Sequence, residues 1–103
     1  MTNAKEEFLE HTEPRSIKCA SITFDYDYSD NRKNYNLPVC WSPLDKSNFL
    51  NCIDQNYESG YGGQELFGTI WYNDGTWSTR GEYDGSEWWE YHECPEVPKD
   101  LIK

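Results

Sequence analysis

The chain has 103 residues and a formal net charge of −10, from 19 Asp and Glu against 9 Lys and Arg. This length allows one domain, and the 17% of aromatic residues, including five Trp and eight Tyr, indicate a folded core built from large rings. The negative charge repels phosphate groups, so it disfavours direct binding of nucleic acid or of an anionic membrane and favours a basic partner.

The N-terminal part combines an arm, a strand and a loop. Residues 1–14 lack a sustained apolar stripe and contain Pro14, which stops a helix, so we predict a loosely ordered arm. Residues 16–27 alternate between apolar and polar side chains, which predicts a half-buried strand whose inner face holds Ala20, Ile22, Phe24 and Tyr26. The polar residues 28–38 are predicted to form a long loop.

A helix is predicted from about residue 43 to residue 55. Ser42 is a typical N-cap, Pro43 suits the first helical position, and Asp45 places a negative charge in the first turn, where the helix dipole favours it. Apolar residues then recur at helical spacing, at Phe49, Leu50 and Ile53.

Residues 66–93 predict a three-stranded antiparallel meander, because Asp74-Gly75 and Asp84-Gly85 separate runs rich in Thr, Tyr and Trp. If both loops have two residues, the better core face holds Leu66, Ile70, Tyr72, Trp77, Tyr83 and Trp88. The opposite face, aromatic and edged with charge, then holds Phe67, Trp71, Arg80, Glu82, Glu87, Trp89 and Tyr91. A three-residue loop at 73–75 would slip the first register and exchange part of these assignments.

The same pairing gives Arg80 a structural interpretation. Glu82 lies opposite Glu87, and such a pair of like charges destabilises a sheet unless Arg80 lies between them and over the ring of Trp89.

Together these elements predict an α+β fold, with an N-terminal strand, one helix and then a three-stranded antiparallel β-meander. The single domain is expected to span residues 15–98, between the arm of residues 1–14 and a tail of residues 99–103.

No metal site or cofactor is predicted. Asp25, Asp27 and Asp30 are spaced as candidate ligands of a hard cation, but the Gly and Glu of a calcium-binding loop are missing, so we interpret them as a solvated acidic loop. The cysteines, at positions 19, 40, 52 and 94, lack the spacing of a zinc knuckle, which disfavours a zinc site with His92.

The absence of a long apolar run argues against a membrane span or a signal peptide, so no membrane partner is expected. We therefore predict a cytoplasmic location in a bacterial host, where the four thiols are reduced.

The last two predicted strands and their turn carry the candidate partner-binding residues, which are Glu82, Asp84, Glu87, Trp89, Glu90, Tyr91 and Glu93. Carboxylates on adjacent strands lie a few ångströms apart, comparable to charges along a nucleic-acid backbone, so this surface could occupy a basic channel as a DNA mimic. The alternative is that the charge only maintains solubility.

The stretch GTIWYNDGTWSTRGEYDGSEWWEYHECPEVP, residues 68–98, resembles in style the C-terminal halves of small acidic orphan proteins of bacteriophages and prophages. That group includes anti-CRISPR and anti-restriction inhibitors. The resemblance implies a phage protein that binds and inhibits a host defence factor, one that handles nucleic acid and presents a basic surface. It implies no functional residue, because those inhibitors share no common motif.

Two other classes of function stay open. The first is a nucleotide or small-molecule binding module, with Trp71, Trp89 and Tyr91 lining a pocket. The second is a small enzyme using Cys94, or Asp25 and Asp27, but no catalytic signature supports it, and we predict that the protein is not an enzyme. An exposed aromatic face is also consistent with a homodimer.

Overall fold

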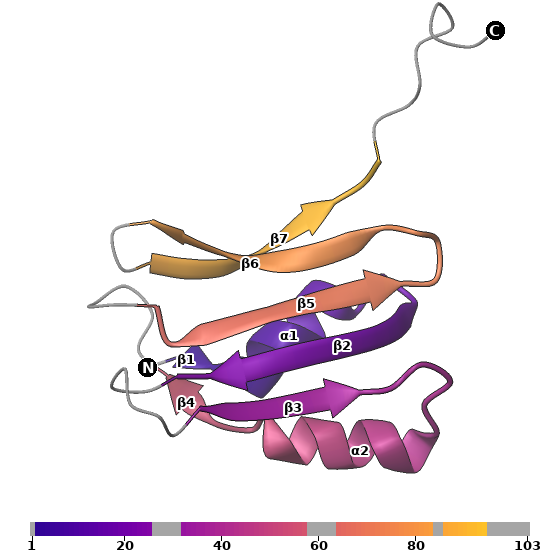
Figure 1. The fold of residues 1–103 in the computed structure, drawn as a ribbon, viewed down its shortest axis with the longest axis horizontal. Coiled ribbons are helices and arrows are strands. Elements are labelled where there is room, and N and C mark those ends of the chain that lie inside the picture. The colour runs from indigo at the N-terminus through magenta and orange to yellow at the C-terminus, as the bar shows by residue number, and fades with distance from the viewer. Residues whose placement is uncertain (1, 26–31, 58–63, 84–85, 95–103) are drawn as a thin grey trace, which may run out of the picture.

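The computed structural model describes residues 2–25, 32–57, 64–83 and 86–94, which form an α+β fold (Figure 1). Within these ranges, a five-stranded antiparallel sheet has the order β3-β2-β5-β6-β7. Its strands are β2 (Ile17–Phe24), β3 (Lys33–Leu37), β5 (Leu66–Tyr72), β6 (Trp77–Tyr83) and β7 (Ser86–His92). Two short strands, β1 (Thr2–Asn3) and β4 (Asn56–Tyr57), pair separately. The predicted class is confirmed, but the predicted layout with one helix is too simple.

Helix α1 (Ala4–Thr12) lies where a loosely ordered arm was predicted over residues 1–14. The side chain of Asn3 caps it by accepting a hydrogen bond of 3.0 Å from the backbone N–H of Glu6. Its buried residues recur at every fourth position, at Ala4, Phe8 and Thr12, so the buried face is a single line of side chains. This stripe is too narrow to stand out against the charged residues around it, which is why the prediction failed.

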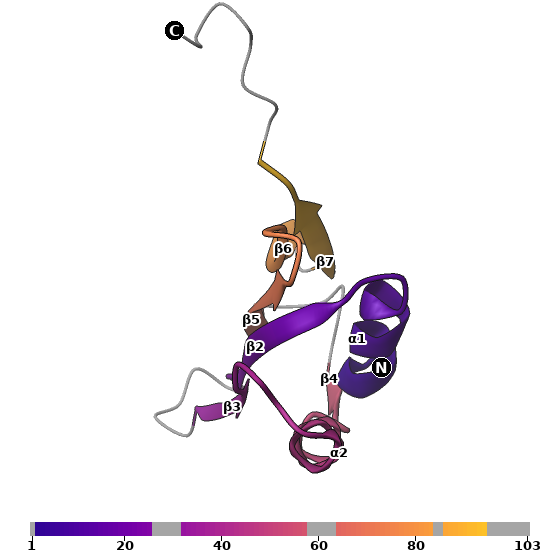
Figure 2. The same cartoon turned by 90° about the vertical axis from the view of Figure 1, so that its right-hand side faces the viewer.

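Helix α2 (Pro43–Cys52) confirms the predicted start and ends three residues before the predicted position. The Ser42 hydroxyl accepts a hydrogen bond from the backbone N–H of Asp45, and the Asp45 carboxylate accepts one from that of Ser42. This reciprocal pair satisfies two donors at the start of the helix. Phe49 and Ile53 are buried beneath it. Helices α1 and α2 lie on the same side of the sheet, and within the described ranges no helix covers the other side (Figure 2).

The first two strands of the sheet pair with each other although a loop was predicted over residues 28–38. Ala20, Ile22 and Phe24 of β2 are buried, as their alternation predicted. Strand β3 pairs antiparallel with β2 at one edge of the sheet, and Leu37 is its one buried residue. The polar sequence of β3 fits an edge strand as well as a loop, so composition did not separate the two. Tyr26 and Asp27 lie outside the described residues.

The turn between β5 and β6 contains three residues, 73–75. The backbone N–H of Tyr72 donates to the carbonyl of Thr76 over 2.9 Å, and Gly75 has a φ of 89°, which glycine adopts without strain. Trp71 consequently lies opposite Trp77. The slipped register is therefore the one that the protein adopts between β5 and β6, and the preferred two-residue loop at Asp74-Gly75 is wrong.

Because of this register, the side chains of β6 and β7 lie on the opposite side of the sheet from the side that was predicted. The side covered by the helices holds Leu66, Ile70, Tyr72, Ser78, Arg80, Glu87 and Trp89. The opposite side holds Phe67, Trp71, Trp77, Tyr83 and Trp88. The pairing between β6 and β7 is as predicted, with Arg80 opposite Trp89 and Gly81 opposite Trp88.

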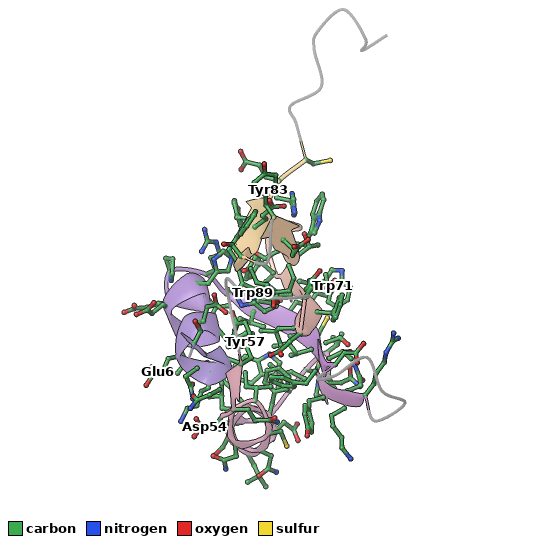
Figure 3. All side chains as sticks on the ribbon, turned by 90° about the vertical axis from the view of Figure 1, so that its left-hand side faces the viewer. Glu6, Asp54, Tyr57, Trp71, Tyr83 and Trp89 are labelled. Atoms are coloured by element: carbon green, nitrogen blue, oxygen red, sulfur yellow. The ribbon has the colours of Figure 1, made fainter. Side chains whose placement is uncertain are left out.

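The core lies between the sheet and the two helices, where Phe8, Phe24 and Tyr57 are fully buried. Gly68 of β5 leaves room for its neighbours within the sheet, because a Cβ there would lie 2.6 Å from the carbonyl oxygen of Ser21 on β2 and 3.2 Å from the Trp89 ring on β7. The Trp89 ring thus packs over a position without a side chain. Figure 3 shows Trp89 and Tyr57 on the helix side of the sheet and Trp71 on the opposite side.

Candidate functional site

The predicted partner-binding residues do not form one surface. Glu87 and Trp89 are buried, with relative exposures of 5% and 8%. Glu90 points to the opposite side of β7, because successive side chains of a strand alternate. Glu82, Tyr91 and Glu93 are exposed, and Asp84 lies outside the described residues. The structure therefore divides the predicted acidic aromatic face into a buried half and an exposed half.

The buried half is centred on Arg80, whose side chain is 1% exposed. Its guanidinium lies 5.0 Å from the centre of the Trp89 ring and donates to the Glu87 carboxylate over 3.4 Å. Glu87 also accepts hydrogen bonds from the backbone N–H groups of Glu65 and Leu66. The predicted position of Arg80, beside Glu87 and over Trp89, is confirmed.

Arg80 also connects the sheet to α1 and β4. It donates to Glu7 over 2.9 Å and to the Tyr57 hydroxyl over 2.8 Å, and that hydroxyl donates to Glu7 over 2.5 Å. Burial and the hydrogen bond to Glu7 raise the pKa of Tyr57 well above its usual range. Tyr57 therefore stays protonated and keeps donating to Glu7 in mildly alkaline solution.

A second buried chain of hydrogen bonds joins α1 to β5 and β6. His11 Nε2 and the Tyr72 hydroxyl each lie 2.7 Å from Ser78 Oγ. Burial, and then the positive charges of Arg15 and Arg80, lower the pKa of His11 below its ordinary 6.5. The pair of Ser78 and His11 has the atoms of a nucleophile and its base, but Ser78 is 0% exposed and no substrate can reach it. These buried groups hold the fold together.

The side of the sheet that faces away from the helices carries five aromatic side chains on three adjacent strands, none of them among the predicted partner-binding residues. We call them the aromatic face: Phe67, Trp71, Trp77, Tyr83 and Trp88. Neither helix covers this side of the sheet (Figure 2). Tyr83 is 77% exposed and Trp71 is 43% exposed. Large apolar side chains gathered on an uncovered surface of a small protein typically mark a binding site.

Trp88 lies flat against the sheet because Gly81, its partner on β6, has no side chain. A Cβ at position 81 would lie 2.6 Å from Trp88 Nε1 and 2.8 Å from Cε2. The indole Nε1–H donates to the Glu90 carboxylate over 3.0 Å, which orients the ring. The other surface of the Trp88 ring faces outward, and the residue is 36% exposed.

At the end of the aromatic face opposite to Trp88, two rings order each other by stacking. The rings of Trp77 and His92 stack with their centres 5.7 Å apart, and Trp71 lies opposite Trp77 on the neighbouring strand. His92 Nε2 and Thr79 Oγ1 are 2.8 Å apart. Rings held by cross-strand neighbours lose little conformational freedom when a partner binds.

The pocket predicted for the nucleotide-binding alternative does not form, since Trp71 lies on the opposite side of the sheet from Trp89 and Tyr91. A hollow of about 500 Å³ exists between α1 and α2. The charged residues that line it include both acids and bases. The ring N–H of Trp41, which also lines it, already donates a hydrogen bond to the carbonyl of Ile17. Two acidic and two basic residues line the hollow, so its charge does not select a ligand of either sign.

The described residues contain no group of three or more metal-binding side chains. Asp25 is buried and pairs with Arg32 over 3.2 Å, whereas Asp27 and Asp30 lie outside the described residues. The four cysteines are free thiols, of which Cys19 is half-buried and the others are exposed. In the part of the chain that the structure describes, neither helix has the length and apolar character needed to cross a membrane.

Comparison of the chain with protein families, with curated proteins and with solved structures gives no match. The function is therefore assigned from the side chains that the structure describes. Sequence reasoning found the aromatic residues and the strands that carry them, but it assigned Trp77, Tyr83 and Trp88 to the core. The signal that could have corrected this was Asn73, which extends the Asp74-Gly75 turn to three residues.

Proposed function

We propose that this protein acts by binding another protein through the aromatic face, and that it belongs functionally with the small phage-type inhibitors of host defence factors. The observation that carries the proposal is the collection of five aromatic side chains, four of them exposed, on the side of the sheet that neither α1 nor α2 covers. Exposed, pre-oriented aromatic residues supply most of the binding energy in many protein interfaces.

Charge supports a basic partner. The chain carries a net charge of −10, and the exposed Glu90 lies on the same side of β7 as Trp88. Glu93 directly follows β7, whereas Glu82 is exposed on the other side of the sheet. An aromatic centre bordered by charged residues is the usual arrangement of a protein interface. Carboxylates at this border attract a basic surface from a distance and speed association. A host protein that handles nucleic acid has such a surface.

The test is capture of a partner from bacterial lysate, after nuclease treatment, by the tagged wild type and by Trp71→Ala. We expect capture that weakens at high salt, because charge contributes to association. Trp71→Ala should lower the affinity about tenfold or more, because it truncates a central exposed ring. The purified partner should then lose its nucleic-acid binding or cleavage when the wild-type protein is added.

Leu44→Ala is the matched control, because Leu44 is 68% exposed on α2, away from the aromatic face. It should behave as the wild type. Binding that is equally strong in Trp71→Ala and at high salt would contradict the proposal. Self-association abolished by Trp71→Ala, measured by light scattering, would instead assign the aromatic face to a homodimer.

A further inference from the structure

Strand β7 carries two pairs of Trp and Glu, one on each side of the sheet. Trp89 and Glu87 are two residues apart and face the helices, whereas Trp88 and Glu90 are two residues apart and face outward. In a strand, residues separated by two positions share a side, so each pair places an indole ring beside a carboxylate.

The pair that faces the helices, Trp89 and Glu87, which we call the inner pair, binds the side chain of Arg80. The pair that faces outward, Trp88 and Glu90, is the outer pair. The Arg80 guanidinium lies 5.0 Å from the centre of the Trp89 ring and donates to Glu87 over 3.4 Å. It thereby combines the attraction of a cation to an aromatic ring with a charged hydrogen bond. The protein itself thus shows which group fits a Trp and a Glu arranged in this way on β7.

The outer pair has the same two components, and no described Lys or Arg forms an ion pair with it. Glu90 receives the Trp88 indole N–H on Oε1, and its Oε2 lies 3.9 Å from His92 Nε2. The Glu90 side chain is 45% exposed. Both the ring surface and the carboxylate can therefore be reached from solvent.

We infer that Trp88 and Glu90 form a receptor for an arginine side chain of the partner. This inference rests on the proposed function and names the chemistry of one contact within it. Arginine fits better than lysine, because its planar guanidinium can stack on the indole while it donates in its own plane to a carboxylate. The Trp88 ring needs no rearrangement, since Gly81 and Glu90 already hold it flat.

The test compares two peptides of equal charge, nine arginines and nine lysines, by titration calorimetry at physiological ionic strength. We expect the arginine peptide to bind the wild type about two- to fivefold more tightly than the lysine peptide, the range that one exposed cation–π contact supplies. Glu90→Gln should reduce this preference, because it removes the charge while keeping an oxygen for the indole N–H.

Gly81→Ala is the sharpest variant, since it replaces no aromatic residue and no charged residue. The added methyl would lie 2.6 Å from Trp88 Nε1 and 2.9 Å from Glu90 Cδ, so it displaces the ring from its position against Gly81. We expect the preference for arginine to disappear in this variant. Glu10→Gln removes one exposed negative charge from α1, on the helix side, and should keep the preference.

Equal binding of the two peptides by the wild type would overturn the inference, as would a preference that survives Gly81→Ala. The melting temperature of each variant shows that the fold is retained. If the arginine preference is absent but partner capture still depends on Trp71, the inference fails and the proposed function stands. If partner capture also fails in the wild type, the proposed function fails with it.

Discussion

Arg80 is the residue on which most buried polar contacts converge. Its guanidinium contacts Glu7, Tyr57 and Glu87, which come from α1, β4 and β7. A buried ion pair adds little stability compared with apolar residues of the same shape, but removing one partner leaves the other charge buried without compensation. Arg80 is thus more important for preventing unpaired charges than for any single contact.

We predict that Arg80→Met lowers the free energy of unfolding by about 3–5 kcal/mol, the usual result of breaking a buried ion pair. Urea unfolding followed by tryptophan fluorescence measures this change. Lys18→Met is the matched control, because Lys18 is exposed and its replacement should change stability by less than about 0.5 kcal/mol. Similar effects of the two substitutions would show that the Arg80 network does not stabilise the fold.

At the scale of elements, α1 is attached to the sheet by one apolar ring and several polar groups. Phe8 packs edge-on against Phe49 and Trp89, while His11 stacks on Trp89 and contacts Ser78. The attachment of α1 should therefore depend on the protonation of His11, whose ring is held in its neutral form.

We predict that stability falls as the pH decreases from about 7.5 to about 5, the range in which histidine titrates. The unfolded chain protonates His11 near its ordinary pKa of 6.5, whereas burial lowers that pKa in the folded protein. Between the two values the unfolded state binds more protons, so acid favours unfolding. Urea unfolding across this pH range measures the slope. His11→Gln should flatten it, and an unchanged slope in that variant would contradict the prediction.

The sequence predicted the elements whose signals are local. The cap at Ser42 and Asp45 marked the start of α2, and alternation at Ala20, Ile22 and Phe24 identified β2, because these patterns depend on neighbouring residues alone. Helix α1 was missed because its stability comes from tertiary contacts of Phe8. Strand β3 was missed because an edge strand needs few apolar residues.

The site was predicted less well than the fold, because its side chains depend on one turn. A single residue added to the turn at 73–75 moves every side chain of β6 to the other side relative to β5. Apolar content also misled the assignment, since the buried side of β6 carries Ser78 and Arg80 while the open side carries Trp77. The polar residues are accommodated only through distant partners such as His11 and Glu7.

At the scale of the whole molecule, negative charge and aromatic surface lie partly on different sides. Helix α1 and its C-cap expose Glu6, Glu10 and Glu13 on the helix side, whereas the aromatic face lies across the sheet (Figure 2). The excess charge therefore acts on the whole molecule through self-repulsion as well as locally at the border of the aromatic face.

We predict that added sodium chloride raises the melting temperature of the free protein, because it screens the repulsion within a chain of net charge −10. This effect is opposite in sign to the weakening of partner binding by salt. Differential scanning calorimetry at low and moderate ionic strength measures it. A variant with Glu6, Glu10 and Glu13 changed to Gln should show a smaller rise, and a melting temperature that falls with salt would refute the prediction.

Residues 87–90 read Glu-Trp-Trp-Glu in both directions. These four residues alone therefore do not determine which Trp is buried, since each side of the strand receives one Trp and one Glu. The choice is made elsewhere, by the length of the turn at 73–75 and by Arg80 on the neighbouring strand. A one-residue deletion in that turn would therefore move the side chains of β6 and β7 to the other side of the sheet, whereas Phe67 and Trp71 of β5 would keep their places.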